Sequence, residues 1–424
     1  MKKVYKMKGY TLHLIPTKKF KTLSMSLRLR SPLTRDTTTL RTLLTFVMIA
    51  ATKKHPSTKA IASYLDECYG ARLSANISTK GQSQIINIHT SFVNENYLPT
   101  KEHLLIDQIQ LMSQLFFEPH IINDGFEKDI VNMKKKEVRE RLQVNKDDKF
   151  SYSLDQLFEK MGEGQALSIA STGYEEDIDD ITPQALYHYF LNCIAHDEKH
   201  LYVVGDIDES IVELFDQYLQ FPEHNESYPS AYTFKKTRND VLRVIEKQDL
   251  TQAKLNLGYS IDCDFCSPQH YAMTVFNAVF GGFAQSKLFR IVREKHSLCY
   301  FVSSSYDAFN GIMIVTAGIE TENYYKTFDL IQEQLQEMKD GHFSEDDINL
   351  AKKMLKNSLK KTNDEAGSMM TLAYNRDIVQ KEESNEEYIE KLMNVSKQDL
   401  IDVAQNIQLD TIFYLAGDEF DEKD

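Results

Sequence analysis

The sequence has few cysteines, no long apolar run and a deficit of basic charge, and each shortage excludes a class of protein. Five cysteines among 424 residues are too few for a disulfide framework, and their odd number is typical of a reducing compartment. The longest uncharged apolar run, residues 43–51, contains a threonine and is far too short to cross a bilayer. Lysines interrupt the N-terminal residues, so no signal peptide is predicted. We therefore expect a soluble, cytoplasmic protein without a membrane partner.

Basic side chains are outnumbered by acidic ones, 49 to 63, which gives a formal net charge of −14. A surface of this sign repels phosphate groups, and the sequence has no basic stripe, so nucleic acid is not expected as a partner. The overall acidity instead favours basic peptides as ligands. Hydrophobic residues make up 42% of the chain, and charges of both signs are mixed. This composition predicts packed globular domains, and the length predicts at least two of them.

Two similar segments lie half a chain length apart and indicate an internal duplication. Residues 201–206 and 413–418 are both apolar and strand-like, and both end in Gly-Asp. So long a period indicates duplicated domains rather than a solenoid, although Gly-Asp after a strand is also a common turn. Residues 222–240, with two prolines and little periodicity, predict a linker. We therefore predict an N-terminal domain at 1–221, a linker at 222–240 and a C-terminal domain at 241–424.

The predicted elements follow the same order in both halves. Alternating or β-rich segments predict strands at 9–16, 22–29, 73–78, 84–92, 241–245, 252–260, 299–305 and 312–317. Helical periodicity predicts helices at 38–52, 58–67, 103–117, 124–144, 151–161, 208–220, 268–280, 285–295, 324–339 and 344–362, with shorter helices and a closing strand after them. This order predicts an α+β fold in which helices cover one face of a mainly antiparallel sheet in each half.

The most informative segment is 281–300, GGFAQSKLFRIVREKHSLCY. The glycine pair at its start predicts a sharp turn, Arg293 ends the following helix, and Tyr300 lies on the next strand. A guanidinium can bind a peptide carbonyl or carboxylate in a fork, and a phenol can donate a hydrogen bond to a developing oxyanion. By spacing alone, these residues could equally be a solvated arginine at a helix end and a half-buried tyrosine.

This segment resembles the signature of the second half of M16 (pitrilysin/insulinase-type) zinc peptidases. In that family an Arg and a Tyr with this spacing hold the peptide substrate, a role that the resemblance assigns to Arg293 and Tyr300. The resemblance spans essentially the whole chain and implies two homologous M16-like (LuxS/MPP-like) domains. It also implies that the edge-type strand 70–76 pairs with an extended peptide, although this segment could be an ordinary strand of a sheet.

The zinc motif of the first half of the family, His-x-x-Glu-His, is missing. In the family its two imidazoles bind zinc and its carboxylate is the general base for a metal-bound water. Residues 51–56, ATKKHP, resemble the turn that follows this motif and place it on Thr42, Thr45 and Phe46. A threonine hydroxyl is a poor zinc ligand, a phenyl ring is none, and Thr45 cannot accept a proton from water near neutral pH.

The remaining ligand of the family is a glutamate on a later helix. The resemblance places it at Lys136, and a shift of one residue places it at Glu137. An ammonium group at this position repels a cation, and one carboxylate without two imidazoles holds zinc poorly.

Two other groups contain residues that can bind metals. His196 and His200 are four residues apart, but they lie where a helix ends and a strand begins, so we do not expect their rings to share a face. Cys263 and Cys266 form a single Cys-x-x-Cys without a second pair or a histidine nearby, which leaves structural thiols, zinc binding and redox use open.

Some M16 peptidases consist of two chains, one with zinc and the other with the Arg/Tyr pair. The present chain most resembles the zinc-free bacterial subunits of the YmfF (YfmF) type, which accompany a zinc-bearing, His-x-x-Glu-His partner of the YmfH type. This implies a non-catalytic subunit of a heterodimeric zinc endopeptidase, with no cofactor of its own and zinc in the partner. The alternatives are a catalytically inactive scaffold or peptide-binding protein, possibly homodimeric, and an autonomous metallopeptidase.

Overall fold

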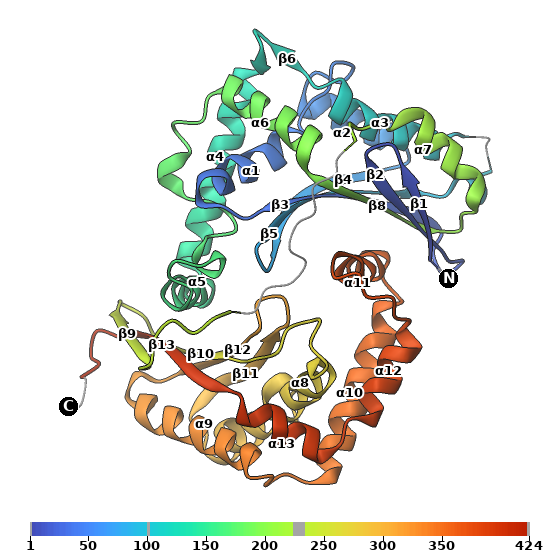
Figure 1. The fold of residues 1–424 in the computed structure, drawn as a ribbon. Coiled ribbons are helices and arrows are strands. Elements are labelled where there is room, and N and C mark those ends of the chain that lie inside the picture. The colour runs from blue at the N-terminus through green and yellow to red at the C-terminus, as the bar shows by residue number, and fades with distance from the viewer. Residues whose placement is uncertain (1, 100–101, 224–233, 422–424) are drawn as a thin grey trace. The chain divides into compact units, whose positions relative to one another are not determined.

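The computed structural model describes residues 2–99, 102–223 and 234–421 (Figure 1). The chain forms two compact units, each with its own sheet and hydrophobic core. Unit 1 comprises Met1–Val144, Ile169–Pro229 and Thr362–Asn375, and unit 2 comprises Asn145–Ser168, Ser230–Lys361 and Arg376–Asp424. Each unit thus includes a segment from the other half of the sequence. The predicted domains 1–221 and 241–424 stay a prediction, and the predicted linker 222–240 lies partly outside the described residues, at 224–233.

Unit 1 contains a six-stranded sheet in which β2 and β8 are parallel and the other neighbours are antiparallel. In spatial order its strands are β1 (Lys3–Met7), β2 (Tyr10–Pro16), β8 (Glu198–Gly205), β3 (Thr22–Pro32), β5 (Ser83–Val93) and β4 (Arg72–Lys80). Strand β4 is the edge strand at one side, which agrees with the prediction for residues 70–76. Strand β1 was not predicted, because its residues are largely exposed and carry little apolar signal.

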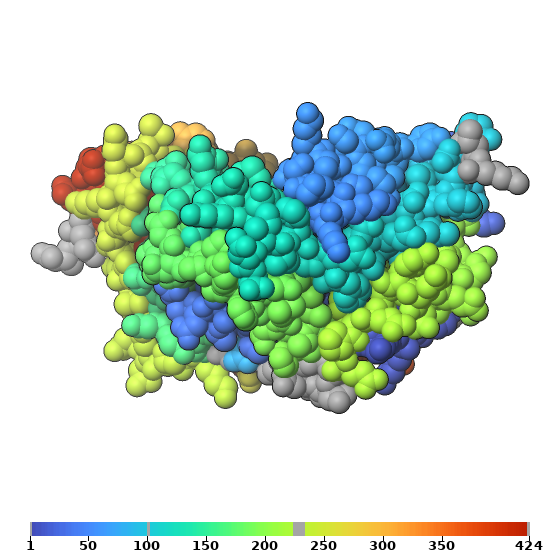
Figure 2. Space-filling view, turned by 90° about the horizontal axis from the view of Figure 1, so that it is seen from above, coloured from blue at the N-terminus to red at the C-terminus, as the bar shows by residue number. Residues whose placement is uncertain are grey.

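Helices cover one face of this sheet (Figure 1). They are α1 (Arg35–Val47), α2 (Thr58–Glu67), α3 (Leu104–Phe117), α4 (Lys128–Asp147), α6 (Pro183–His196) and α7 (Val212–Tyr218). Figure 2 shows this helical layer from outside, in blue to green. Strand β3 explains why only one face is apolar: Leu23, Met25, Leu27 and Leu29 alternate with serines and arginines and enter the core.

Unit 2 repeats this plan. Its five-stranded sheet has the order β11 (Cys299–Asp307), β12 (Ile312–Ile319), β10 (Ala253–Ser260), β13 (Gln408–Ala416) and β9 (Leu242–Lys247). Strands β9 and β13 are parallel and the other pairs are antiparallel. Read from the β9 edge, this order matches β2-β8-β3-β5-β4 of unit 1 in both sequence and direction. The predicted α+β class, with mainly antiparallel sheets covered by helices, is confirmed, and β11 of unit 2 corresponds to β4 of unit 1.

The helices of unit 2 lie in the second half of the sequence, apart from α5. They are α8 (His270–Asn277), α9 (Tyr324–Lys339), α10 (Glu345–Thr362), α12 (Asn385–Asn394) and α13 (Lys397–Gln405). The exception is α5 (Lys149–Met161), which comes from the first half of the sequence. Helix α11 (Ala366–Ile378) begins in unit 1 and ends in unit 2. Leu157 and Met161 of α5 pack with Phe234 on an apolar sheet face that Ile312 and Phe413 also form. This second face of the sheet is therefore closed in unit 2.

Several predicted boundaries were wrong for local reasons. The helix predicted at 124–144 begins at Lys128, because Asn123 and Asp124 have φ of 52° and 58° and turn a short hairpin between β6 (Ile121–Ile122) and β7 (Gly125–Phe126). The helix predicted at 38–52 ends at Val47. No helix within the described ranges has both the length and the apolar character needed to span a bilayer.

Candidate functional site

The predicted metal-motif positions all lie on the buried side of α1. Thr42, Thr45 and Phe46 are all buried. Thr45 Oγ1 donates a hydrogen bond to the carbonyl oxygen of Arg41 at 2.8 Å, so its hydroxyl is used within the helix. These side chains are packing groups rather than a set of ligands.

The helix is fixed by a buried ion pair one residue before this motif. Arg41 Nη2 lies 2.5 Å from Asp197 Oδ2 and donates to the carbonyl oxygen of Leu29 at 2.7 Å. Burial alone lowers the pKa of Arg41, but the Asp197 carboxylate raises it overall, so the guanidinium stays charged. A permanent cation next to the motif adds to the cost of placing a metal ion there.

The structure distinguishes the two candidates for the remaining ligand on α4. The Lys136 side chain is 79% exposed and pairs with Glu140. Glu137 accepts hydrogen bonds from Lys134 Nζ at 2.7 Å and from Arg141 Nη2 at 2.9 Å. The Arg141 guanidinium carbon in turn lies 4.4 Å from the ring centroid of Phe46. The geometry therefore connects Glu137, and not Lys136, to the motif positions on α1.

A guanidinium thus occupies the space between the Phe46 ring and the Glu137 carboxylate. Burial raises the pKa of Glu137, but the hydrogen bonds and charges of Lys134 and Arg141 outweigh this effect and lower it. The Glu137 carboxylate is therefore ionised, and its charge is compensated by ion pairs with Lys134 and Arg141. Together with two hydroxyls and a phenyl ring, it does not fit the ligand set that zinc requires. The described residues also contain no cluster of three His, Cys, Asp or Glu side chains arranged for a metal ion.

The second predicted site begins where a helix that ends in a glycine pair lies close against a strand. The glycine pair lies in a π-helical segment, Ala278–Gly282, and neither glycine has a positive φ. A Cβ atom on Gly281 would lie 2.5 Å from Ser304 Oγ and 2.7 Å from its backbone nitrogen. The predicted turn follows directly after the pair, at residues 283–286, before the next helix begins. Gly281 itself is needed because its helix lies directly against β11.

Arg293 lies near the end of a second π-helical segment, Phe289–Lys295, and its guanidinium carbon is 4.6 Å from the ring centroid of Phe289. Ser297, two residues after this segment, has φ of 52°, and the Leu298 nitrogen donates to the carbonyl oxygen of Val292 at 3.1 Å. π-Helical segments are rare and often occur at functional sites. Arg293 is exposed at the point where the chain turns into β11.

Tyr300 lies at a bulge of β11. The register with β12 shifts between Cys299 and Phe301, so Tyr300 is left out of the ladder and its side chain is 61% exposed. Its hydroxyl donates to Glu320 Oε1 at 2.6 Å, and this hydrogen bond raises the pKa of Tyr300. Tyr300 and Arg293 lie at the two ends of one short connection, both exposed, at the edge of the unit 2 sheet.

The other candidate metal groups are not assembled. His196 ends α6 and its Nδ1 lies 3.1 Å from the Asn192 carbonyl oxygen, whereas His200 is buried on β8. Cys263 is buried with its sulfur 3.4 Å from the Tyr306 hydroxyl, and Cys266 is exposed. All five cysteines are free thiols.

A buried polar cluster on unit 1 was not predicted. His200 Nε2 donates to Glu198 Oε1 at 2.9 Å, which leaves His200 Nδ1 to accept from His13 Nε2 at 2.9 Å. The His13 ring stacks on Tyr202 with centroids 4.3 Å apart. Burial, with a smaller contribution from His200, lowers the pKa of His13 to about 2. Polar residues alternating with apolar ones in β2, β3 and β8 were the sequence signal for this cluster.

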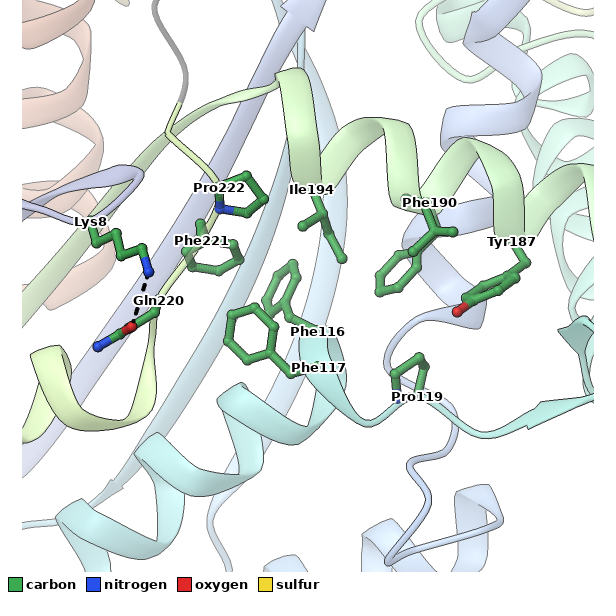
Figure 3. A pocket seen from close by; sticks show the side chains of 11 residues that line it. Lys8, Phe116, Phe117, Pro119, Tyr187, Phe190, Ile194, Gln220, Phe221 and Pro222 are labelled. Carbon is green, nitrogen blue, oxygen red and sulfur yellow. Dashed lines mark hydrogen bonds between the residues drawn. The ribbon is translucent and has the colours of Figure 1, made fainter.

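Unit 1 also has an open groove of about 470 Å³ (Figure 3). Figure 3 shows the rings of Phe116, Phe117 and Phe221 gathered on one side, with Phe190 and Tyr187 of α6 on the other. None of the residues that line it is a predicted site residue. The groove is therefore separate from the motif positions.

Comparison with known proteins gives consistent relatives. Residues 180–355 match the family described as "Peptidase M16 inactive domain". The chain is 37% identical over 413 residues to the Bacillus subtilis (strain 168) protein named "Probable inactive metalloprotease YmfF", covering 97% of this chain and 96% of that protein. It is 22% identical over 265 residues to "Uncharacterized zinc protease YmxG" of the same organism, covering 62% and 63%. The crystal structure of a conserved protein from Enterococcus faecalis V583 has a TM-score of 0.92 at 31% identity, covering 99% of this chain and 100% of that one.

Proposed function

Because the chain belongs to the peptidase M16 family as an inactive homologue of its metallopeptidases, we propose that it is the non-catalytic subunit of a heterodimeric zinc endopeptidase. In this proposal Arg293 and Tyr300 hold the peptide while a partner subunit supplies zinc and the general base. The observation that carries the proposal is the contrast between the two predicted sites. The positions on α1 are packed with groups that cannot bind zinc, whereas Arg293 and Tyr300 are exposed at a sheet edge.

The chemistry of the exposed pair supports this role. The Arg293 guanidinium offers a fork of donors for a peptide carbonyl or carboxylate. The Tyr300 hydroxyl must be protonated to donate a hydrogen bond to an oxyanion, and a tyrosine hydroxyl is protonated at neutral pH. Glu320, which accepts from Tyr300, holds the hydroxyl in a defined direction until the substrate replaces it.

The partner in this proposal is an M16 subunit of the YmfH type that carries His-x-x-Glu-His and binds the zinc. The related "zinc protease" and "inactive metalloprotease" of one bacterium support the idea that both kinds of chain occur in one cell. The five free thiols are compatible with a reducing compartment, and a cytoplasmic location is part of the proposal.

Reconstitution with such a partner tests the proposal. The chain carrying Arg293→Ala and Tyr300→Phe is mixed with the zinc-bearing subunit, and peptide cleavage is compared with that of the unchanged pair. Loss of one oxyanion donor typically lowers the rate about 100- to 1000-fold, so we expect at least a 100-fold loss of kcat. The matched control carries Arg243→Ala and Tyr97→Phe, which remove the same groups from exposed positions elsewhere.

Two outcomes contradict the proposal. Cleavage that is equal for the double variant and its control shows that the pair does not hold the substrate. A chain that forms homodimers and does not bind the zinc-bearing subunit supports the alternative, an inactive scaffold or peptide-binding protein.

A further inference from the structure

The second face of the unit 1 sheet, opposite the helical layer, is polar from its β4 edge inward. The strand registers place Ser74, His89, Ser26, Tyr202 and His13 in one row across the sheet. The next row is Asn76, Asn87, Arg28 and His200, and the row on the other side begins with Arg72, Ser91 and Ser24. We call these three rows the polar platform.

The polar platform contains two arginines and three histidines and no carboxylate. The next row outward holds Glu198, but this group is already bonded to Arg30 and His200. The two arginines of the polar platform, Arg28 and Arg72, therefore give a protein with a formal net charge of −14 a local region of the opposite sign. The equivalent face of unit 2 is apolar and closed by α5, so this property belongs to unit 1 alone.

Arg28 is the central charge of the polar platform. Its residue is 7% exposed, its Nε donates to Ser26 Oγ at 3.3 Å and its Nη2 donates to Thr371 Oγ1 at 3.0 Å. The rings of Tyr374 and Tyr202 lie 4.5 Å and 5.6 Å from its guanidinium carbon. Within the described part of the chain, no carboxylate forms an ion pair with Arg28. Hydroxyls and aromatic faces compensate a buried guanidinium only partly.

The surroundings of Arg28 leave an approach from outside. Thr371 is exposed, and the β4 and β5 side chains next to Arg28 in its row, Asn76 and Asn87, are exposed and partly exposed. Ser26 Oγ donates to Asn87 Oδ1 at 2.5 Å, which leaves the amide nitrogen of Asn87 as a further donor beside the guanidinium. An anionic group that reached this point from the β4 edge would meet the Arg28 guanidinium and the amide nitrogen of Asn87 as donors.

We infer that the polar platform binds a carboxylate of an extended peptide, with Arg28 as the group that recognises the charge. The inference deepens the proposed function, because it defines the substrate class as acidic peptides. It also reverses the expectation from overall composition, which favoured basic ones. Charge complementarity selects the ligand: a buried cation with donors around it is stabilised by an anion and destabilised by a second cation.

A binding measurement on the full chain, without any partner, tests the inference. The probe is a capped octapeptide in which serine alternates with glutamate, labelled with a net-neutral fluorophore, and the matched probe has glutamine in place of glutamate. At low salt we expect the glutamate peptide to bind at least about ten times more tightly, because a hydrogen bond between two charged groups is stronger than one to a neutral amide. Arg28→Gln is expected to remove this preference. Arg243→Gln, which removes the same charge from unit 2, is expected to keep it.

A second variant covers the case in which Arg28→Gln does not fold. Arg28→Lys keeps the charge and loses the fork, and we expect it to reduce the preference at least threefold. Equal binding of both probes by the unchanged chain, or an unchanged preference in a folded Arg28 variant, overturns the inference. Because the partner is absent, these results leave the reconstitution test of Arg293 and Tyr300 unaffected, and failure of that test leaves these results in place.

Discussion

Rebuilding the zinc motif on α1 by Thr42→His, Thr45→Glu and Phe46→His is expected to give only weak zinc binding while Arg141 is present. The Arg141 guanidinium carbon lies 4.4 Å from the centre of the ring that the third substitution replaces. A zinc ion held there would be close to a permanent cation. The same guanidinium also neutralises Glu137, the carboxylate that the rebuilt site needs as a ligand.

The size of this penalty follows from Coulomb's law. Two unit charges 4 Å apart interact by about 4 kcal/mol at the effective dielectric constant of a protein surface, so a divalent ion gives about 8 kcal/mol. The Arg141 side chain is 60% exposed, and solvent and salt screen it. We therefore take on the order of 3 kcal/mol as the net effect, which corresponds to roughly a 100-fold change in Kd.

Competition with a chromophoric chelator measures this change. Adding Arg141→Gln to the rebuilt motif is expected to tighten zinc binding about 100-fold. Arg139→Gln, on the same helix and paired with Asp179, is the control and is expected to change little. In the variant that carries the rebuilt motif together with Arg141→Gln, the further substitution Glu137→Gln is expected to weaken zinc binding. Lys136→Gln in the same variant is expected to leave zinc binding unchanged.

Two results would contradict this prediction. Equal zinc affinity with and without Arg141 would mean that the guanidinium moves aside at no cost. A stronger effect of Lys136→Gln than of Glu137→Gln would mean that α4 presents the other residue to the site.

Two further predictions concern stability. Gly281→Ala should lower the free energy of unfolding by about 1–3 kcal/mol in a denaturant titration, because the added Cβ would overlap Ser304. The control Gly367→Ala, whose Cβ would have no atom within 4 Å, should be neutral or stabilising. Equal effects of the two substitutions would contradict the close contact at Gly281. His13 has a pKa of about 2 in the folded protein, whereas an unfolded histidine has a pKa near 6.5. Below pH 6.5 the unfolded chain therefore binds one more proton at this residue than the folded chain. The free energy of unfolding then falls by about 1.4 kcal/mol for each pH unit. His13→Asn should reduce this slope between pH 6.5 and 5.5 relative to the exposed control His188→Asn, and an unchanged slope would refute it.

The fold could be predicted because its pattern is local. The alternation in β3 defines its buried face, and the order of strands and helices repeats in the two halves, so the α+β class and the duplication followed from sequence. The segment 281–300 led to the family, which the relatives confirm. The π-helical segments were not predictable, because their apolar spacing differs from that of an α-helix by less than one residue per turn.

What the sequence could not predict depends on contacts between distant segments. The helix at 151–161 was predicted, but nothing in it indicates that it closes the sheet of unit 2 rather than that of its own half. Arg141 lies far from Phe46 in sequence, so the guanidinium at the former ligand position was not foreseen. In the sequence, Arg28 is one of several charges on a strand. Only the register and the α11 residues Thr371 and Tyr374 show that it is buried, with no carboxylate partner among the residues that the structure describes.

We propose that this chain binds no zinc of its own and that any zinc belongs to another subunit. The most direct test is the zinc content of the chain purified by affinity from its native cell, measured before and after its partners are removed. We expect about one zinc ion per complex and essentially none in the separated chain. One tightly bound zinc ion per separated chain, with cleavage that a chelator abolishes, would contradict it.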